Sequence, residues 1–140
     1  MALSARSGGP ESFAVTMIMK VLLIDCSVVR QRQLRTVLSG LGQRLENIQG
    51  VSDARAVRAN ANGAFDVIFV HDEASDVDGL LTVRDLRQTG QTGGIVAYGS
   101  SPTRQDVLDA IAAGASAFLA YPFSMDDVEK VLAPLSRPLR

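Results

Sequence analysis

Val21-Leu22-Leu23-Ile24-Asp25-Cys26 (residues 21–26) is the stretch that decides the fold, because four consecutive aliphatic residues run directly into polar ones. An uninterrupted aliphatic run is typical of a strand that is buried on both faces of a parallel sheet. We predict a strand over residues 17–25. Ser27 offers an N-cap for a helix that follows, with apolar residues at helical spacing. This opening predicts the first strand–helix unit of an α/β fold.

Similar apolar runs recur along the chain and alternate with segments of helical period. The expected strands are residues 17–25, 46–51, 66–71, 95–98 and 116–120. The expected helices begin after Ser27, at Ser52-Asp53, at Leu80, after Gly99 and at Ser124. The helix after Gly99 has an apolar stripe formed by Val107, Leu108, Ile111, Ala112 and Ala115. The alternation predicts βαβ units, and therefore a (βα)5 three-layer sandwich around a five-stranded parallel sheet.

Length and composition favour one globular domain. The chain has 140 residues, of which 46% are hydrophobic and 21% charged, which is sufficient for one core. We expect a flexible leader over residues 1–16, the domain over 17–135 and a short tail over 136–140. The net charge of −1 and the aromatic content of 5% argue against a nucleic-acid surface. The absence of a long apolar stretch argues against a membrane span, and a single cysteine fits the reducing cytoplasm.

The rarest side chains fall at the ends of predicted strands. The only cysteine is Cys26, the only histidine is His71, and the two tyrosines are Tyr98 and Tyr121. The carboxyl ends of parallel strands line a single crevice, where ligands bind in open α/β sheets. We therefore expect these four side chains to lie close to one another.

Residues 20–132 resemble the receiver domain of bacterial two-component response regulators, a flavodoxin-like fold. The resemblance rests on four pieces in their order and spacing: residues 23–27 with the following helix, residues 65–71, Asp78-Gly79-Leu80, and residues 112–123 with Tyr121-Pro122-Phe123. It implies a domain that moves a phosphoryl group from a kinase histidine onto its own aspartate. Carboxylates would hold Mg²⁺, a lysine would pair with the phosphoryl group, and a Ser or Thr hydroxyl would contact it.

The sequence departs from that pattern at nearly every reactive position. The resemblance places His71 at the phosphoacceptor position and Cys26 at one of the two metal carboxylates, while Asp25 remains. The hydroxyl position falls on Gly99, or on Tyr98 if the alignment shifts by one, and the lysine position on Tyr121. Because phosphoryl transfer depends on these charges, the sequence predicts a degenerate receiver with no catalytic residue, no metal, no cofactor and no enzyme activity.

Other positions carry expectations about the surface. Asp72, Glu73 and Asp78 form an acidic loop, and Asp78 is also a candidate N-cap. Phe118 fits the aromatic position that reorients in active receivers, and the resemblance implies a cis peptide before Pro122. The family's usual partner and dimer surface is formed by the fourth helix, the fifth strand and the fifth helix.

The packing of the crevice leaves alternatives open. Tyr121 is the better candidate to bridge the crevice to His71 or Asp25 and to plug it, because Tyr98 is expected to point to the other face of the sheet. Cys26 is expected to be a small buried thiol, and His71 a partly buried imidazole bonded to Asp25 or to a tyrosine. The arginines are expected on solvated helix faces.

We therefore predict a stand-alone signalling module that acts by phosphorylation-independent contact with a protein, such as a histidine kinase or another regulator, or as a homodimer. A second hypothesis is phosphorylation at Asp72 or His71. A third is a metal or redox sensor at Cys26 and His71. A scaffold without switching is a fourth.

Overall fold

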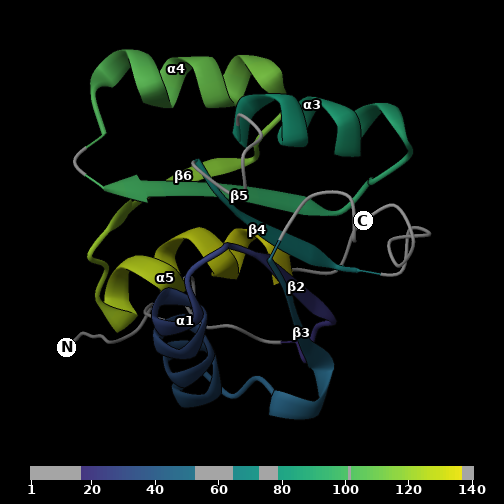
Figure 1. Cartoon of the computed structure of the whole chain (residues 1–140). Helices are drawn as coiled ribbons and strands as arrows, with labels where there is room; N and C mark the ends of the chain where they lie inside the picture. Colours follow the sequence, from purple (N-terminus) through teal and green to yellow (C-terminus); the bar gives the residue numbers. More distant parts are fainter. Residues whose placement is uncertain (1–16, 53–64, 73–78, 101, 137–140) are drawn as a thin grey trace, which may run out of the picture.

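The protein is described by a computed structural model that covers residues 17–52, 65–72, 79–100 and 102–136. A five-stranded parallel sheet crosses the molecule in the order β3-β2-β4-β5-β6 (Figure 1). Its strands are β2 (Val21–Ile24), β3 (Ile48–Val51), β4 (Val67–His71), β5 (Gly94–Ser100) and β6 (Ala117–Tyr121). This order is the flavodoxin-like one, so the predicted fold class is confirmed.

Helices cover both faces of the sheet, with α1 and α5 on one face and α3 and α4 on the other (Figure 1). They are α1 (Val28–Gly40), α3 (Gly79–Gln88), α4 (Arg104–Ala113) and α5 (Met125–Leu132), with 3₁₀ turns η2 (Leu45–Asn47) and η3 (Ala133–Ser136). The helix expected from Ser52-Asp53 lies mostly outside the described residues. No helix among those described is long and apolar enough to cross a bilayer.

The core is divided between the two faces of the sheet because side chains alternate along each strand. Leu23 and Phe69 belong to the cluster beneath α1 and α5, whereas Leu22 and Ile68 belong to the cluster beneath α3 and α4. All the residues of β2 and β4 are buried, which explains why these strands read as continuous apolar runs.

The strand boundaries differ from the predicted ones where side chains take over backbone hydrogen bonds. β2 begins at Val21 rather than at residue 17. The N–H of Met19 donates to Gln43 Oε1, and that of Lys20 donates to Asp66 Oδ2, so both donors are satisfied outside the ladder. The predicted start of the second strand at residue 46 is also wrong, because η2 occupies residues 45–47.

Helix starts follow the expected capping chemistry. Ser27 caps α1, accepting from the N–H of Arg30. The helix α5 begins after Ser124, which forms a capping box with Asp127, an aspartate in the position usually held by glutamate. The helix expected after Gly99 begins at Arg104, because Thr103, which follows Pro102, is its N-cap.

The expectation that the arginines lie on solvated helix faces is wrong for several of them. Arg87 donates from Nε to the carbonyl oxygen of Gly114 and from Nη1 to those of Gln91 and Gly93. Gly114 has a φ of +121°, and a Cβ there would lie 2.6 Å from Arg87 Cγ. Both the backbone conformation and the lack of space therefore require a glycine at this position. Arg87 thereby joins the end of α3 to the loops before β5 and β6.

Candidate functional site

Strand register brings most of the predicted crevice residues together. Ile24 pairs with Val70 and His71 pairs with Tyr98, so the residues that end β2, β4 and the C-terminal part of β5 are neighbours. Asp25 follows β2 directly. The carboxyl edge of the central strands therefore places Asp25, His71 and Tyr98 side by side, as their positions at the strand ends predict.

Asp25 is the centre of this cluster and is completely buried. Its carboxylate accepts a bidentate pair of hydrogen bonds from Arg30, with Nε to Oδ2 and Nη2 to Oδ1 both at 2.8 Å. Oδ2 also accepts from the Tyr98 hydroxyl at 2.5 Å, and Oδ1 from the N–H of Ser27 at 2.8 Å. Both oxygens are thus engaged by protein donors, and Arg30 neutralises the charge.

These contacts determine the ionisation of the cluster. Burial by itself raises the pKa of Asp25, but the hydrogen bonds from Arg30, Tyr98 and Ser27 and the field of His71 outweigh it, so its pKa is lowered. The hydrogen bond to Asp25 raises the pKa of Arg30. Burial, followed by the bond to Asp25, raises the pKa of Tyr98 far above its ordinary value. Near neutral pH the cluster is a carboxylate, a guanidinium and a neutral phenol.

His71 lies beside this cluster and is only 2% exposed. Its ring meets the Tyr98 ring edge to face, with centroids 5.1 Å apart and an interplanar angle of 73°. Its Nδ1 is 3.5 Å from Oδ1 of Asp72. An imidazole with an apolar contact on one side and a carboxylate on the other therefore occupies the position at which the resemblance expects a nucleophile.

Asp72 and Gly99 are fitted to each other. The N–H of Asp72 donates to the carbonyl oxygen of Tyr98 at 2.8 Å, which continues the β4–β5 pairing by one residue. A Cβ at Gly99 would lie only 2.1 Å from Asp72 Oδ2. A Ser or Thr side chain at position 99 would therefore require the Asp72 carboxylate to move.

The expected roles of the two tyrosines are reversed. Tyr121 was expected to bridge the crevice to His71 or Asp25, but its hydroxyl donates to Gln33 Oε1 on α1. Tyr98 was expected on the other face of the sheet, yet it bonds Asp25. Residues that pair directly across strands share a face, and the pairing of Tyr98 with His71 places both rings beneath α1 and α5.

The other predicted site residues have different surroundings. Cys26 is exposed, so the expectation of a small buried thiol is wrong. Glu73 and Asp78 lie outside the described residues, and among those described no group of three His, Cys, Asp or Glu side chains could hold a metal ion. Phe118 is half-buried against the core on the α3 and α4 side.

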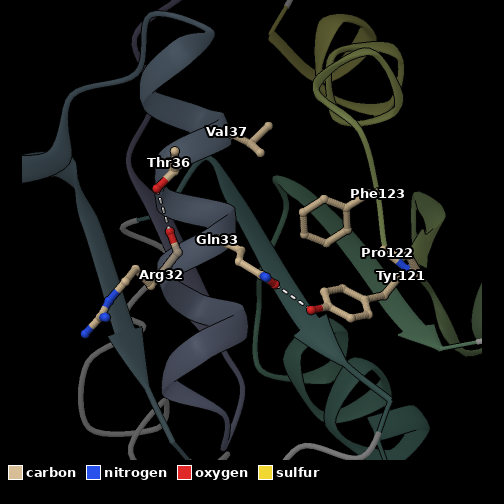
Figure 2. Close-up of a pocket in the computed structure, with 7 residues that line it drawn as sticks. All are labelled: Arg32, Gln33, Thr36, Val37, Tyr121, Pro122 and Phe123. Atoms are coloured by element: carbon tan, nitrogen blue, oxygen red, sulfur yellow. Dashed lines mark hydrogen bonds between the residues drawn. The ribbon is translucent and has the colours of Figure 1, made fainter.

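A surface groove of about 420 Å³ opens between α1 and the turn after β6 (Figure 2). Its lining residues are Arg32, Gln33, Thr36, Val37, Tyr121, Pro122 and Phe123. The peptide bond before Pro122 is cis, as the resemblance implies. Phe123 meets Tyr121 edge to face at 5.4 Å and meets Tyr98 in the same way at 6.2 Å. The groove is thus connected to the buried cluster by aromatic contacts.

The described part of α4 presents apolar side chains to solvent. Its predicted apolar stripe is wrong in part, because Leu108 and Ile111 are 50% and 45% exposed, while Ala110 and Ala113 pack against the sheet. Small residues face the core here, where α4 packs against α3 and β6. The larger residues Leu108 and Ile111 are left on the exposed side of the helix.

Sequence comparison identifies the family. The profile of the response regulator receiver domain matches residues 21–133, which is most of the chain. The chain belongs to the response regulator receiver domain family. A search of curated proteins gives no significant match.

Solved receiver domains share this fold at low sequence identity. The receiver domain of a LuxO repressor protein from Vibrio parahaemolyticus has a TM-score of 0.74 at 16% identity, covering 86% of this chain and 91% of its own. The chemotaxis protein CheY4 of Vibrio cholerae has a TM-score of 0.74 at 24% identity, covering 85% and 99%. A CheX–CheY–BeF3–Mg²⁺ complex from Borrelia burgdorferi has a TM-score of 0.74 at 17% identity, covering 84% and 89%.

Sequence reasoning missed the role of Arg30 and Gln33. Arg30 is expected on a solvated helix face with the other arginines, although it lies in the first turn of α1, five residues after Asp25, and Gln33 carries no expectation. A cation in the turn that directly follows a buried carboxylate is the signal that could have indicated the pair, because a carboxylate without a partner at that depth is strongly destabilising.

Proposed function

We propose that this receiver domain acts in signal transduction without aspartyl phosphorylation, through contact with a protein partner. Membership of the receiver family supports the signalling role. One observation in the crevice supports the independence from phosphorylation. The carboxylate of Asp25 is saturated by donors from its own chain.

The donor set does not fit the Mg²⁺ ion that phosphoryl transfer in this family uses. Mg²⁺ prefers carboxylate and water oxygens in a strict octahedral arrangement. Arg30 binds both oxygens of Asp25, so a metal ion would have to displace a guanidinium from a buried carboxylate. Cys26 provides sulfur where oxygen is needed, which is a poor match for a hard cation. We derive no step through this metal.

The other reactive positions support the same proposal. An imidazole at His71 cannot form an acyl phosphate, and Tyr121 provides no ammonium to stabilise phosphoryl oxygens. Gly99 has no hydroxyl to contact a phosphoryl group, and its space is taken by the Asp72 carboxylate. Acceptor, metal ligand, lysine and hydroxyl are thus replaced together, while the fold is retained.

We propose that the partner is a protein, such as a kinase or another regulator, and that the module works in the reducing cytoplasm. The surface formed by α4, β6 and α5 is the candidate contact area. Leu108 and Ile111 are exposed on α4, the helix that packs against the edge strand β6, and exposed apolar groups that lie together favour protein association. Half-buried Phe118 and exposed Pro122 lie on and directly after β6.

Intact-mass spectrometry tests the proposal. The protein is incubated with acetyl phosphate and Mg²⁺, and separately with candidate kinases, beside a receiver that has all the usual reactive residues as the positive control. We expect no added phosphate on this chain and a single added phosphate on the control. A phosphate that maps to Asp72 or His71 would refute the proposal.

A further inference from the structure

Two tyrosine hydroxyls tie the ends of β5 and β6 to the same helix. Tyr98 donates to Asp25, which Arg30 of α1 also binds. Tyr121 donates to Gln33 of α1. Arg30 and Gln33 are three residues apart, so they lie on adjacent turns of one helix face. The first contact is buried and the second lies in the surface groove, as Figure 2 shows for Tyr121 and Gln33.

Phe123 lies between these two contacts. Its ring meets the Tyr121 ring at 5.4 Å and 82°, and it meets the Tyr98 ring at 6.2 Å and 78°. Both contacts have the edge-to-face geometry that aromatic pairs prefer. The Tyr98 ring then contacts His71, so the aromatic contacts continue from the groove to the crevice.

We infer that Phe123 couples the Tyr121–Gln33 contact in the groove to the buried Tyr98–Asp25–Arg30 cluster. When Tyr121 leaves Gln33, its ring no longer holds the edge of Phe123, and Phe123 no longer confines the Tyr98 ring. The Tyr98 hydroxyl then loses its alignment with Asp25. A change in the groove therefore alters the crevice with no phosphoryl group involved.

The coupling goes beyond the proposed function and does not depend on it. Coupling between two sites is reciprocal, so loosening the buried cluster also weakens the contact of Tyr121 with Gln33. A double-mutant cycle measures this coupling directly.

The cycle uses Tyr98→Phe, Tyr121→Phe and the double variant, which remove the hydroxyls and keep the rings. Urea unfolding gives the equilibrium constant of each. The effect of a variant is the factor by which it changes this constant relative to the native protein. We expect the factor for the double variant to differ from the product of the two single factors by at least about threefold. In a Phe123→Leu background the effects should multiply. The inference would be overturned if the single effects simply multiply in the native background. It would also be overturned if the double variant departs from their product equally in the Phe123→Leu background.

A matched control removes an exposed hydrogen bond far from Phe123. Gln105 donates to Asp109 on the outer surface of α4, and Gln105→Met removes this bond. Its effect should multiply with that of Tyr98→Phe. A departure as large as that of the Tyr98 and Tyr121 pair would overturn the inference, because the non-additivity would then be general.

An NMR measurement covers the case in which Tyr98→Phe does not fold. The Nε–H of Arg30 donates to Asp25 and reports the cluster directly. Tyr121→Phe should shift this resonance in the native background and leave it in place in the Phe123→Leu background. An Arg30 resonance that does not respond to Tyr121→Phe in the native background would overturn the inference.

Discussion

Replacing Arg30 with methionine removes the cation that neutralises Asp25 while keeping the length of the side chain. Asp25 is completely buried and loses two hydrogen bonds of 2.8 Å. Hydrogen bonds to charged groups each contribute roughly 1.5–3 kcal/mol, and breaking a buried ion pair costs about 3–5 kcal/mol. Because the Arg30 side chain is 22% exposed, solvent screens the pair, and we expect a loss of about 2–4 kcal/mol at pH 7.

The loss should depend on pH with a definite sign. In the native protein the pKa of Asp25 is lowered, so its stabilisation is present above the usual aspartate pKa of about 3.9 and is lost as pH falls through the folded value. Without Arg30, burial raises the pKa of Asp25, and this group takes up a proton at higher pH. The difference in stability between native and variant protein should therefore narrow between pH 7 and about pH 4.

Urea unfolding at both pH values measures these differences. Arg44→Met is the matched control, because Arg44 forms an exposed ion pair with Glu46 at 3.8 Å, and such pairs contribute about 0–1 kcal/mol. If Arg30→Met lowers the free energy of unfolding no more than Arg44→Met does, the argument that Arg30 neutralises a buried carboxylate is wrong. It is also wrong if the decrease caused by Arg30→Met is the same at both pH values.

Three further predictions concern single contacts. Tyr98→Phe should cost about 1.5–3 kcal/mol at pH 7 in urea unfolding, because the Asp25 carboxylate loses a buried donor; a cost below 0.5 kcal/mol, taken as an order-of-magnitude limit, would count against that bond. Gly99→Ser should lower the free energy of unfolding by about 1–3 kcal/mol, because its Cβ meets Asp72. In combination with Asp72→Ala this decrease should largely vanish, and a decrease that persists in the double variant would refute the steric reason. Ser124→Ala should lower stability by about 1 kcal/mol, since α5 loses its N-cap, and thermal unfolding that does not change would contradict it.

The fold could be predicted from the sequence because its central strands β2, β4 and β5 are buried on both faces. An uninterrupted apolar run such as residues 21–24 or 67–70 is typical of a strand in a buried parallel sheet, and the polar residues after it mark the carboxyl end. The boundaries near Met19 and Glu46 were less accurate. There the backbone bonds to distant side chains or forms a 3₁₀ turn, and local sequence does not reveal either.

The arrangement of the crevice could be predicted only in part. Strand ends placed Asp25, His71 and Tyr98 at one edge, but the face that a side chain occupies depends on the register of the strand. β5 runs to Ser100, beyond the end predicted at Tyr98, and its register pairs Tyr98 with His71. The sequence did not indicate this register. Arg30 reaches Asp25 because its long side chain folds back from the helix. Helical periodicity considers only the position of Arg30 on the helix, and this position indicates a solvated side chain.

The central claim is that the Asp25 carboxylate is held by its own chain and is closed to a metal-bound phosphoryl group. Amide and side-chain NMR spectra recorded during titration with Mg²⁺ and beryllofluoride test this most directly. We expect no saturable shift at Asp25, His71, Gly99 or the Nε–H of Arg30. A saturable shift at these positions, with the Arg30 resonance released from Asp25, would contradict it.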